Sequence, residues 1–107
     1  MIYAYIRTNS GDEKYYVQDR NGQCKAIEEY CKKHDIKIDE YVYEDCGIML
    51  PINLRRLGRL FDRMAPGDKL ICADDSRISR LESELKATKK RCKKNDIDLI
   101  VLTDHRD

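Results

Sequence analysis

Apolar residues along the chain follow two different patterns. In short runs they occupy consecutive positions, which is typical of strands buried on both faces of a sheet. In longer stretches they recur every three or four positions, which predicts helices with one buried face. The two patterns alternate and predict the order strand, helix, strand, helix, strand, helix, strand.

These patterns place seven elements along the chain. Strands are predicted at residues 2–6, 36–43, 70–73 and 97–102. Helices are predicted at residues 23–34, 54–64 and 81–95. The polar stretch from residue 8 to residue 22 contains Gly11 and the Asn21-Gly22 pair, so we expect a long loop there. Long loops in compact domains are often functional.

Alternating strands and helices predict an α/β fold, in which a small, mainly parallel sheet is flanked by helices. We expect about four strands in the order 2-1-3-4 and about three helices. A chain of 107 residues matches the usual size of one domain, so we expect a single domain over residues 1–107.

Charge and cysteine content narrow the function classes. The 21 Lys and Arg residues almost cancel the 20 Asp and Glu residues, which argues against a strongly basic, freestanding nucleic-acid-binding protein. The apolar runs are too short to cross a membrane, and the first residues lack a signal-peptide pattern, so we expect a cytoplasmic protein without a membrane partner. In that reducing compartment the five cysteines should be free thiols, mostly buried.

Two polar clusters are predicted at the carboxyl ends of strands, where ligands bind in open α/β sheets. Arg7 and Ser10 follow the first strand, and Arg77 and Arg80 follow the third. Because these strands are neighbours in the order 2-1-3-4, the clusters should face each other across one crevice. Arginine presents a planar fork that matches phosphate oxygens, and helix N-termini favour anions. The sequence therefore predicts a pocket for a phosphate group.

The second cluster has competing interpretations. Ser79 and Glu82 fit a capping box, which would start the third helix after Ser79 and leave Arg77 in the preceding loop. If the helix starts earlier, Arg77 and Arg80 share a face of its first turn. A plainer interpretation is that the arginines form surface ion pairs with the adjacent aspartates, Asp74 and Asp75.

Several short motifs occur in a characteristic order. The first strand ends in Tyr5-Ile6-Arg7-Thr8-Asn9-Ser10, and the third is followed by Ser76-Arg77-Ile78-Ser79-Arg80. Weaker motifs at fitting places are Gln23, Asp45-Cys46-Gly47 and Gly67-Asp68. Over about residues 1–103 this series resembles the N-terminal catalytic domain of the serine recombinases, the resolvase/invertase family. In that family the first strand ends in Tyr-x-Arg-Val-Ser-Thr, and the third strand is followed by Asp/Ser-Arg-Leu-x-Arg. The motif after the third strand is the most specific of the series.

The resemblance implies site-specific DNA recombination, with strand exchange through a covalent phosphoserine–DNA intermediate. Ser10 would be the nucleophile, and Arg7, Arg77 and Arg80 would bind and neutralise the phosphate. The family's reaction uses neither a metal nor another cofactor. The implied partners are DNA, reached through a larger assembly or a missing region, and further copies of the chain in a homo-oligomer.

Departures from the family pattern keep a second function open. In a gap-free alignment Asn9 takes the place of the family's serine, and Ser10 follows one residue later. Residues 47–53 contain no arginine, although the family has one there, and the next candidates are Arg55 and Arg56. We also expect the chain to lack the family's C-terminal long helix and DNA-binding region. The alternative is a catalytically silent, resolvase-like module for interaction or regulation.

Two other kinds of site have weaker support. Cys24, Cys31 and His34 lie on one predicted helical stripe, with Cys46 as a candidate fourth metal ligand, but the chain has no Cys-x-x-Cys pair. We therefore expect this stripe to pack in the core. A magnesium-dependent phosphoacceptor pocket is disfavoured because the first strand ends in Arg7, which has the wrong charge.

Overall fold

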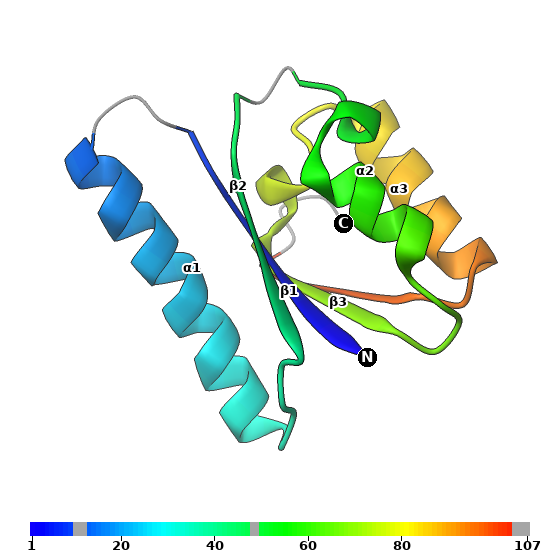
Figure 1. Ribbon diagram of the computed structural model, residues 1–107, viewed down its shortest axis with the longest axis horizontal. Coiled ribbons are helices and arrows are strands. Elements are labelled where there is room, and N and C mark those ends of the chain that lie inside the picture. The colour runs from blue at the N-terminus through cyan, green and yellow to red at the C-terminus, as the bar shows by residue number, and fades with distance from the viewer. Residues whose placement is uncertain (10–12, 48–49, 104–107) are drawn as a thin grey trace.

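A four-stranded parallel sheet forms the centre of the molecule (Figure 1). The computed structural model describes residues 1–9, 13–47 and 50–103. The strands are β1 (Ile2–Thr8), β2 (Glu40–Asp45), β3 (Lys69–Asp74) and β4 (Asp98–Thr103). Their order is β2-β1-β3-β4, and the three neighbouring pairs are parallel. The α/β fold class and the strand order predicted from the sequence are confirmed.

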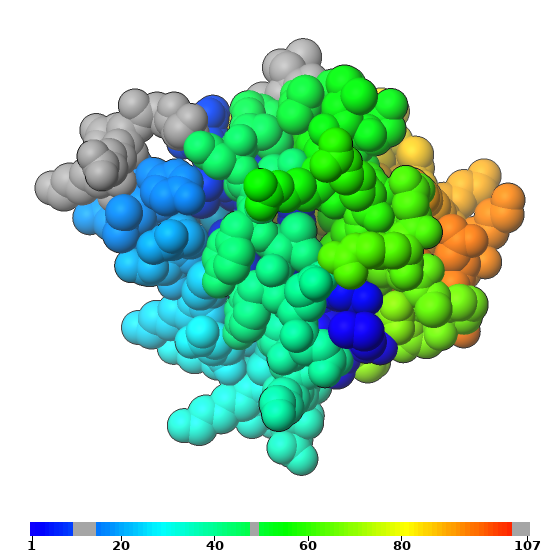
Figure 2. Space-filling model, in the orientation of Figure 1, coloured from blue at the N-terminus to red at the C-terminus, as the bar shows by residue number. Residues whose placement is uncertain are grey.

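Helices cover the sheet on both faces (Figure 1). They are α1 (Glu13–Lys33), α2 (Arg56–Arg63) and α3 (Glu82–Lys94), with short 3₁₀ turns η1 (Ile52–Leu54) and η2 (Asp75–Arg77). In the space-filling view, residues of the edge strand β2 remain visible between α1 and α2 (Figure 2). Among the described residues, no helix is both long enough and apolar enough to span a membrane.

Alternation along the central strands divides the core into two layers. Tyr3 and Tyr5 of β1 point to the face covered by α2 and α3, where they join a cluster with Leu57, Leu60, Leu70 and Leu85. Ala4 and Ile6 point to the other face and pack with Ile27 and Cys31 of α1. Because β1 and β3 are buried on both faces, their apolar residues are consecutive, as the sequence indicated.

Helix α1 begins much earlier than the sequence pattern suggested. Residues 13–22, predicted as a loop, are its first ten residues, and the predicted start at Gln23 is wrong. A glycine inside a helix costs about 1 kcal/mol relative to alanine, which is why Gly22 was interpreted as a breaker. Here Gly22 is exposed, and the residues around it are mostly good helix formers, so the surrounding helix outweighs that cost.

The remaining boundaries differ by a few residues. β2 begins at Glu40 rather than at residue 36, since Asp35 ends the turn after α1 with a positive φ of 55° and Asp39 caps the edge of β1 by accepting a hydrogen bond from the Ile2 N–H. The predicted second helix is divided between η1 and α2, with Arg55 at the junction. α3 begins at Glu82, close to the predicted position.

Candidate functional site

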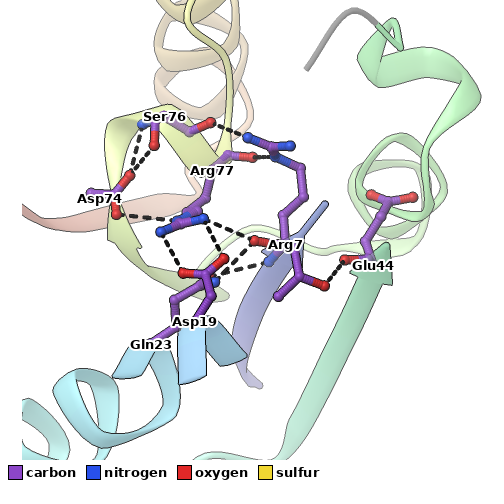
Figure 3. Close-up of polar contacts among 8 residues, drawn as sticks. Arg7, Asp19, Gln23, Glu44, Asp74, Ser76 and Arg77 are labelled. Carbon is purple, nitrogen blue, oxygen red and sulfur yellow. Dashed lines mark hydrogen bonds and ion pairs between the residues drawn. The ribbon is translucent and has the colours of Figure 1, made fainter. Parts of the chain in front are cut away.

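Arg7 lies at the carboxyl end of β1, almost fully buried, and its guanidinium group binds backbone. Nε donates to the carbonyl oxygen of Arg77 at 3.1 Å, and Nη2 donates to that of Ser76 at 2.8 Å (Figure 3). Nη1 donates to the carbonyl oxygen of Cys46 at 3.0 Å. Burial, with the neighbouring charge of Arg55, lowers the pKa of Arg7 from its ordinary value. Arg7 therefore fixes the segments that follow β2 and β3 against the end of β1.

Arg77 lies in η2, directly after β3, and binds two carboxylates. Asp19 of α1 accepts from Nη2 at 2.9 Å and from Nη1 at 3.1 Å, which is the bidentate fork geometry (Figure 3). Asp74 accepts from Nε at 3.1 Å. Nη1 also donates to the carbonyl oxygen of Arg7 at 3.1 Å, so Arg7 and Arg77 hold each other's backbone.

The η2 turn has its own local support. Asp74, at its N-cap position, accepts hydrogen bonds from both the backbone N–H and the hydroxyl of Ser76. The ion pair of Arg77 with Asp74 was one of the competing interpretations, and it is present. The predicted capping box is wrong: the N-cap residue of α3 is Leu81, and the buried Ser79 hydroxyl instead accepts from the Leu81 N–H at 3.0 Å.

Gln23 connects α1 to the end of β1. Its buried side-chain amide accepts from the Arg7 N–H at 3.2 Å and donates to the Arg7 carbonyl oxygen at 2.9 Å (Figure 3). The pairing of β1 with β3 ends at Tyr5, so the backbone N–H and carbonyl oxygen of Arg7 have no partner on β3. The Gln23 amide provides the hydrogen bonds that a neighbouring strand would otherwise provide. Gln23, one of the weaker family motifs, was predicted at the start of the helix, but it lies in the middle of α1.

The three predicted arginines lie around one pocket of about 550 Å³. Its lining residues are Arg7, Asn9, Tyr15, Gln18, Asp19, Arg77 and Arg80. The expectation that the clusters after the first and third strands face each other is met, since Arg7 and Arg77 are in contact and Arg80 is exposed at the rim. Ser10, the predicted nucleophile, lies outside the described residues. Three cationic side chains and one carboxylate line the pocket, which favours an anionic ligand.

Sequence reasoning missed Asp19, which was assigned to a loop and not considered as a partner of Arg77. It lies 58 residues from Arg77 in the chain, and only their packing brings them together. The available signal was helical spacing: Tyr15, Gln18 and Asp19 are three and four positions apart and so share one helix face.

A second buried network, also missed, lies beside the site. The carboxylate of Glu44 accepts from the Tyr5 hydroxyl and, at 2.6 Å, from the backbone N–H of Arg56 at the start of α2. Burial and this carboxylate raise the pKa of Tyr5 well above its ordinary value. Arg55, about 1% exposed, donates to the carbonyl oxygens of Leu50 at 2.7 Å and Ile78 at 2.6 Å. These bonds connect the segment after β2 to the segment between η2 and α3.

The stripe considered as a metal site packs as expected only in part. Cys31 is buried against β1 and β3, whereas the exposed His34 has its ring centroid 4.2 Å from that of Tyr30. Across residues 1–9, 13–47 and 50–103, no group of three or more histidine, cysteine or carboxylate side chains is arranged to hold a metal ion. The five cysteines are free thiols.

Comparison with solved structures identifies proteins with the same fold. The C-terminal catalytic domain of ISC1926 TnpA, an IS607-like serine recombinase, has a TM-score of 0.73 at 16% identity, covering 94% of this chain and 66% of that one. The N-terminal catalytic domain of TP901-1 integrase has 0.71 at 16% identity, covering 94% and 76%. A serine recombinase from Sulfolobus solfataricus has 0.71 at 18% identity, covering 99% and 70%.

Comparison at the level of sequence gives the family. No curated protein matches the chain significantly. The model of the family described as "Resolvase, N terminal domain" matches residues 2–107, which is nearly the whole chain. Its order of motifs, its strand order and its solved structural neighbours agree with that match. The chain therefore belongs to the resolvase N-terminal domain family and has the fold of a serine recombinase catalytic domain.

Proposed function

We propose that this domain cleaves and rejoins DNA strands, with Ser10 as the nucleophile and the arginine pocket as the site of the reacting phosphate. The observation that carries the proposal is the meeting of Arg7, Arg77 and Arg80 in one pocket, although the first two are 70 residues apart. The pocket lies at the carboxyl ends of adjacent parallel strands, where α/β folds bind ligands. Guanidinium groups there suit the oxygens of a phosphodiester.

The arginines have different roles in this proposal. Arg7 directs its donors mainly to backbone carbonyl oxygens, so it positions η2 and contributes its charge to the pocket. Arg77, partly exposed, and Arg80, at the rim, supply N–H donors to the phosphate oxygens. Asn9 lines the pocket, and Ser10, the proposed nucleophile, is the next residue in the sequence.

The proposed reaction is a phosphoryl transfer without change in the number of phosphodiester bonds. The Ser10 hydroxyl oxygen forms a bond to phosphorus, the bond from phosphorus to one deoxyribose oxygen breaks, and the serine proton ends on that sugar oxygen. The arginines stabilise the charge that develops on the phosphoryl oxygens. Attack by a sugar hydroxyl of another strand end reverses the step and joins the strands. The bond energy is kept in the phosphoserine link, so rejoining the strands requires no nucleotide as an energy source.

DNA is the proposed partner, held through a larger assembly. A net charge of +1 provides little general attraction to a polyanion, because affinity for duplex DNA grows with the number of phosphates that basic residues neutralise. We therefore expect high-affinity DNA contact to come from further copies of the chain in a homo-oligomer or from an additional DNA-binding region.

The test is to trap the covalent intermediate. The domain, alone and fused to a sequence-specific DNA-binding module, is incubated with a duplex nicked near the cleavage position, so that the released strand diffuses away. A protein–DNA adduct resistant to denaturing electrophoresis is expected for the wild type and for the control Ser83→Ala, an exposed serine of α3, and absent for Ser10→Ala. An adduct that survives Ser10→Ala refutes the nucleophile assignment.

A second candidate function has one specific observation in its favour. Arg77 is bound by the carboxylates of both Asp19 and Asp74, and Asn9 lies in the pocket where a gap-free alignment puts the family's serine. This arrangement suits a catalytically silent module for interaction or regulation. Such a module forms no adduct as the wild type or when fused to the DNA-binding module, but Asn9→Ser, which puts a hydroxyl at the pocket position, gains one.

A further inference from the structure

The donors that Arg77 would offer to a phosphate are already in use. A guanidinium group has five N–H donors, and four of those of Arg77 are directed at the two oxygens of Asp19, at Asp74 and at the carbonyl oxygen of Arg7. The bidentate fork on Asp19, at 2.9 and 3.1 Å, is the geometry by which arginine binds a phosphate. The Asp19 carboxylate thus occupies the position that a phosphate's two oxygens would take.

The two carboxylates on Arg77 differ in how firmly they are held. Asp74 also accepts hydrogen bonds from the N–H and the hydroxyl of Ser76, and these bonds shape the η2 turn (Figure 3). Asp19 extends from one face of α1 toward the pocket, and its side chain is 35% exposed. A change of rotamer moves the Asp19 carboxylate out of the fork without altering α1, whereas displacing Asp74 dismantles the turn.

Charge makes simultaneous binding unfavourable. A phosphate on Arg77 with Asp19 still in place would bring two anionic groups onto one guanidinium edge. With Asp19 turned away, the charged residues that line the pocket are the three arginines, and Asp74 remains on the Nε side of Arg77. Binding of the anion and release of Asp19 are therefore coupled, since each is favourable when the other occurs.

We propose that Asp19 is an internal competitor for the phosphate site, which it occupies until a phosphate displaces it from Arg77. Asp19 then sets the affinity of the pocket and confines Arg77 to a productive orientation when no substrate is bound. This inference rests on the phosphate-binding part of the proposed function. It does not depend on Ser10 or on a covalent step.

The experiment measures the affinity of the pocket for inorganic phosphate. The whole chain is titrated with phosphate, and binding is followed by two-dimensional NMR of backbone amides and arginine Nε–H groups. Asp19→Asn removes the charge with little change in shape, and Asp19→Ser removes both the charge and the reach. Glu29→Gln is the matched control, because Glu29 is an exposed acidic residue of the same helix, outside the pocket lining. Far-UV circular dichroism checks that each variant is folded.

The expected result is tighter binding in both Asp19 variants. We expect the dissociation constant for phosphate to fall by about tenfold, which is the order expected when a like charge at contact distance is removed from a partly exposed site. Glu29→Gln should stay within about twofold of the wild type, because distant exposed charges are largely screened. The Arg77 Nε–H resonance should shift on titration.

Two outcomes of the phosphate titration would contradict the inference. If both Asp19 variants bind phosphate no more tightly than the wild type, Asp19 only positions Arg77, and the inference is wrong. If no variant binds phosphate, the pocket is not an anion site, and the inference fails with it. Tighter phosphate binding without any covalent DNA adduct keeps this inference and removes the recombinase proposal, so the two are separable.

Discussion

Two glycines in helices test two features of the fold: Gly58 the close approach of η1 to α2, and Gly22 the early start of α1. At Gly58, a β-carbon would lie 2.4 Å from the backbone oxygen of Ile52 and 2.9 Å from the α-carbon of Asn53. Both atoms belong to the backbone of η1, so no side chain can rotate away to make room. At Gly22, in the middle of α1, a β-carbon would meet no atom within 4 Å. The same substitution, glycine to alanine, should therefore have opposite effects at the two positions.

At each position, the change in the free energy of unfolding is the balance between helix propensity and steric overlap. Alanine is favoured over glycine inside a helix by at most about 1 kcal/mol. Gly22→Ala should gain most of this, about 0.5–1 kcal/mol. Gly58→Ala must separate a carbon–oxygen contact by about 1 Å to reach an ordinary distance of about 3.3 Å, and such overpacking costs about 1–3 kcal/mol or more. Gly58 lies in the first turn of the short α2, where the propensity gain is smallest, so the clash should win.

The assay is equilibrium unfolding in urea, followed by tyrosine fluorescence and far-UV circular dichroism. The seven tyrosines lie within residues 3–43, so their fluorescence reports on β1, α1 and β2, whereas circular dichroism reports on all the helices. Coincident transitions of the two probes check two-state behaviour. With unchanged slopes, the midpoint should rise for Gly22→Ala and fall for Gly58→Ala. An increase in the stability of Gly58→Ala would refute the close approach of η1 to α2. A loss for Gly22→Ala would refute the helical conformation of residues 13–22.

Three further outcomes test the buried network, the N-terminal ion pair and the thiols. Glu44→Ala should lower the free energy of unfolding by about 2–4 kcal/mol, because it leaves the Tyr5 hydroxyl and the Arg56 N–H without their acceptor. A decrease of less than about 1 kcal/mol, measured by urea unfolding, would contradict this expectation. The backbone N–H of Ala65 and the N-terminal ammonium group lower the pKa of Asp68 below its ordinary 3.8, so its stabilising contribution is present at neutral pH and is lost as pH falls through that lowered pKa. Wild type and Asp68→Asn should therefore differ in urea midpoint at pH 7 and converge in strong acid, and a constant difference would argue against the ion pair. Burial raises the pKa of Cys92 to about 11, so a thiol reagent near neutral pH should react with Cys92 more slowly than with the half-buried cysteines, and rapid reaction of Cys92 in the folded protein would contradict its burial. These half-buried cysteines are Cys24 and Cys46.

The fold could be predicted largely because its signals are local. β1 and β3 are central strands, so their consecutive apolar residues mark them directly in the sequence. The error at α1 came from the same local reasoning. A polar stretch with a glycine favours a loop when considered alone, but here it continues a helix whose other end packs on the sheet, and that packing supports the exposed turns.

The site could be predicted in part, for a topological reason. Arg7 lies at the carboxyl end of one strand, and Arg77 and Arg80 follow its neighbour. Because parallel strands end at the same edge, strand order alone brings these arginines together. The hydrogen bonds of these arginines could not be derived in this way. Arg7 binds carbonyl oxygens rather than facing solvent, and Arg77 binds Asp19, a residue of α1.

The sequence by itself determined the succession of strands and helices, the two-sided burial of the central strands and the edge of the sheet at which the arginines gather. Each of these follows from periodicity and connectivity, which act between near neighbours in the chain. Only the tertiary structure decided that the Asp19 carboxylate binds the Arg77 guanidinium group. It also decided that Glu44 binds the start of α2 and that Arg55 binds the segment between η2 and α3. Those contacts depend on how α1 and α2 are oriented on the sheet, and a few degrees or ångströms of packing decide whether a carboxylate meets a guanidinium group or water.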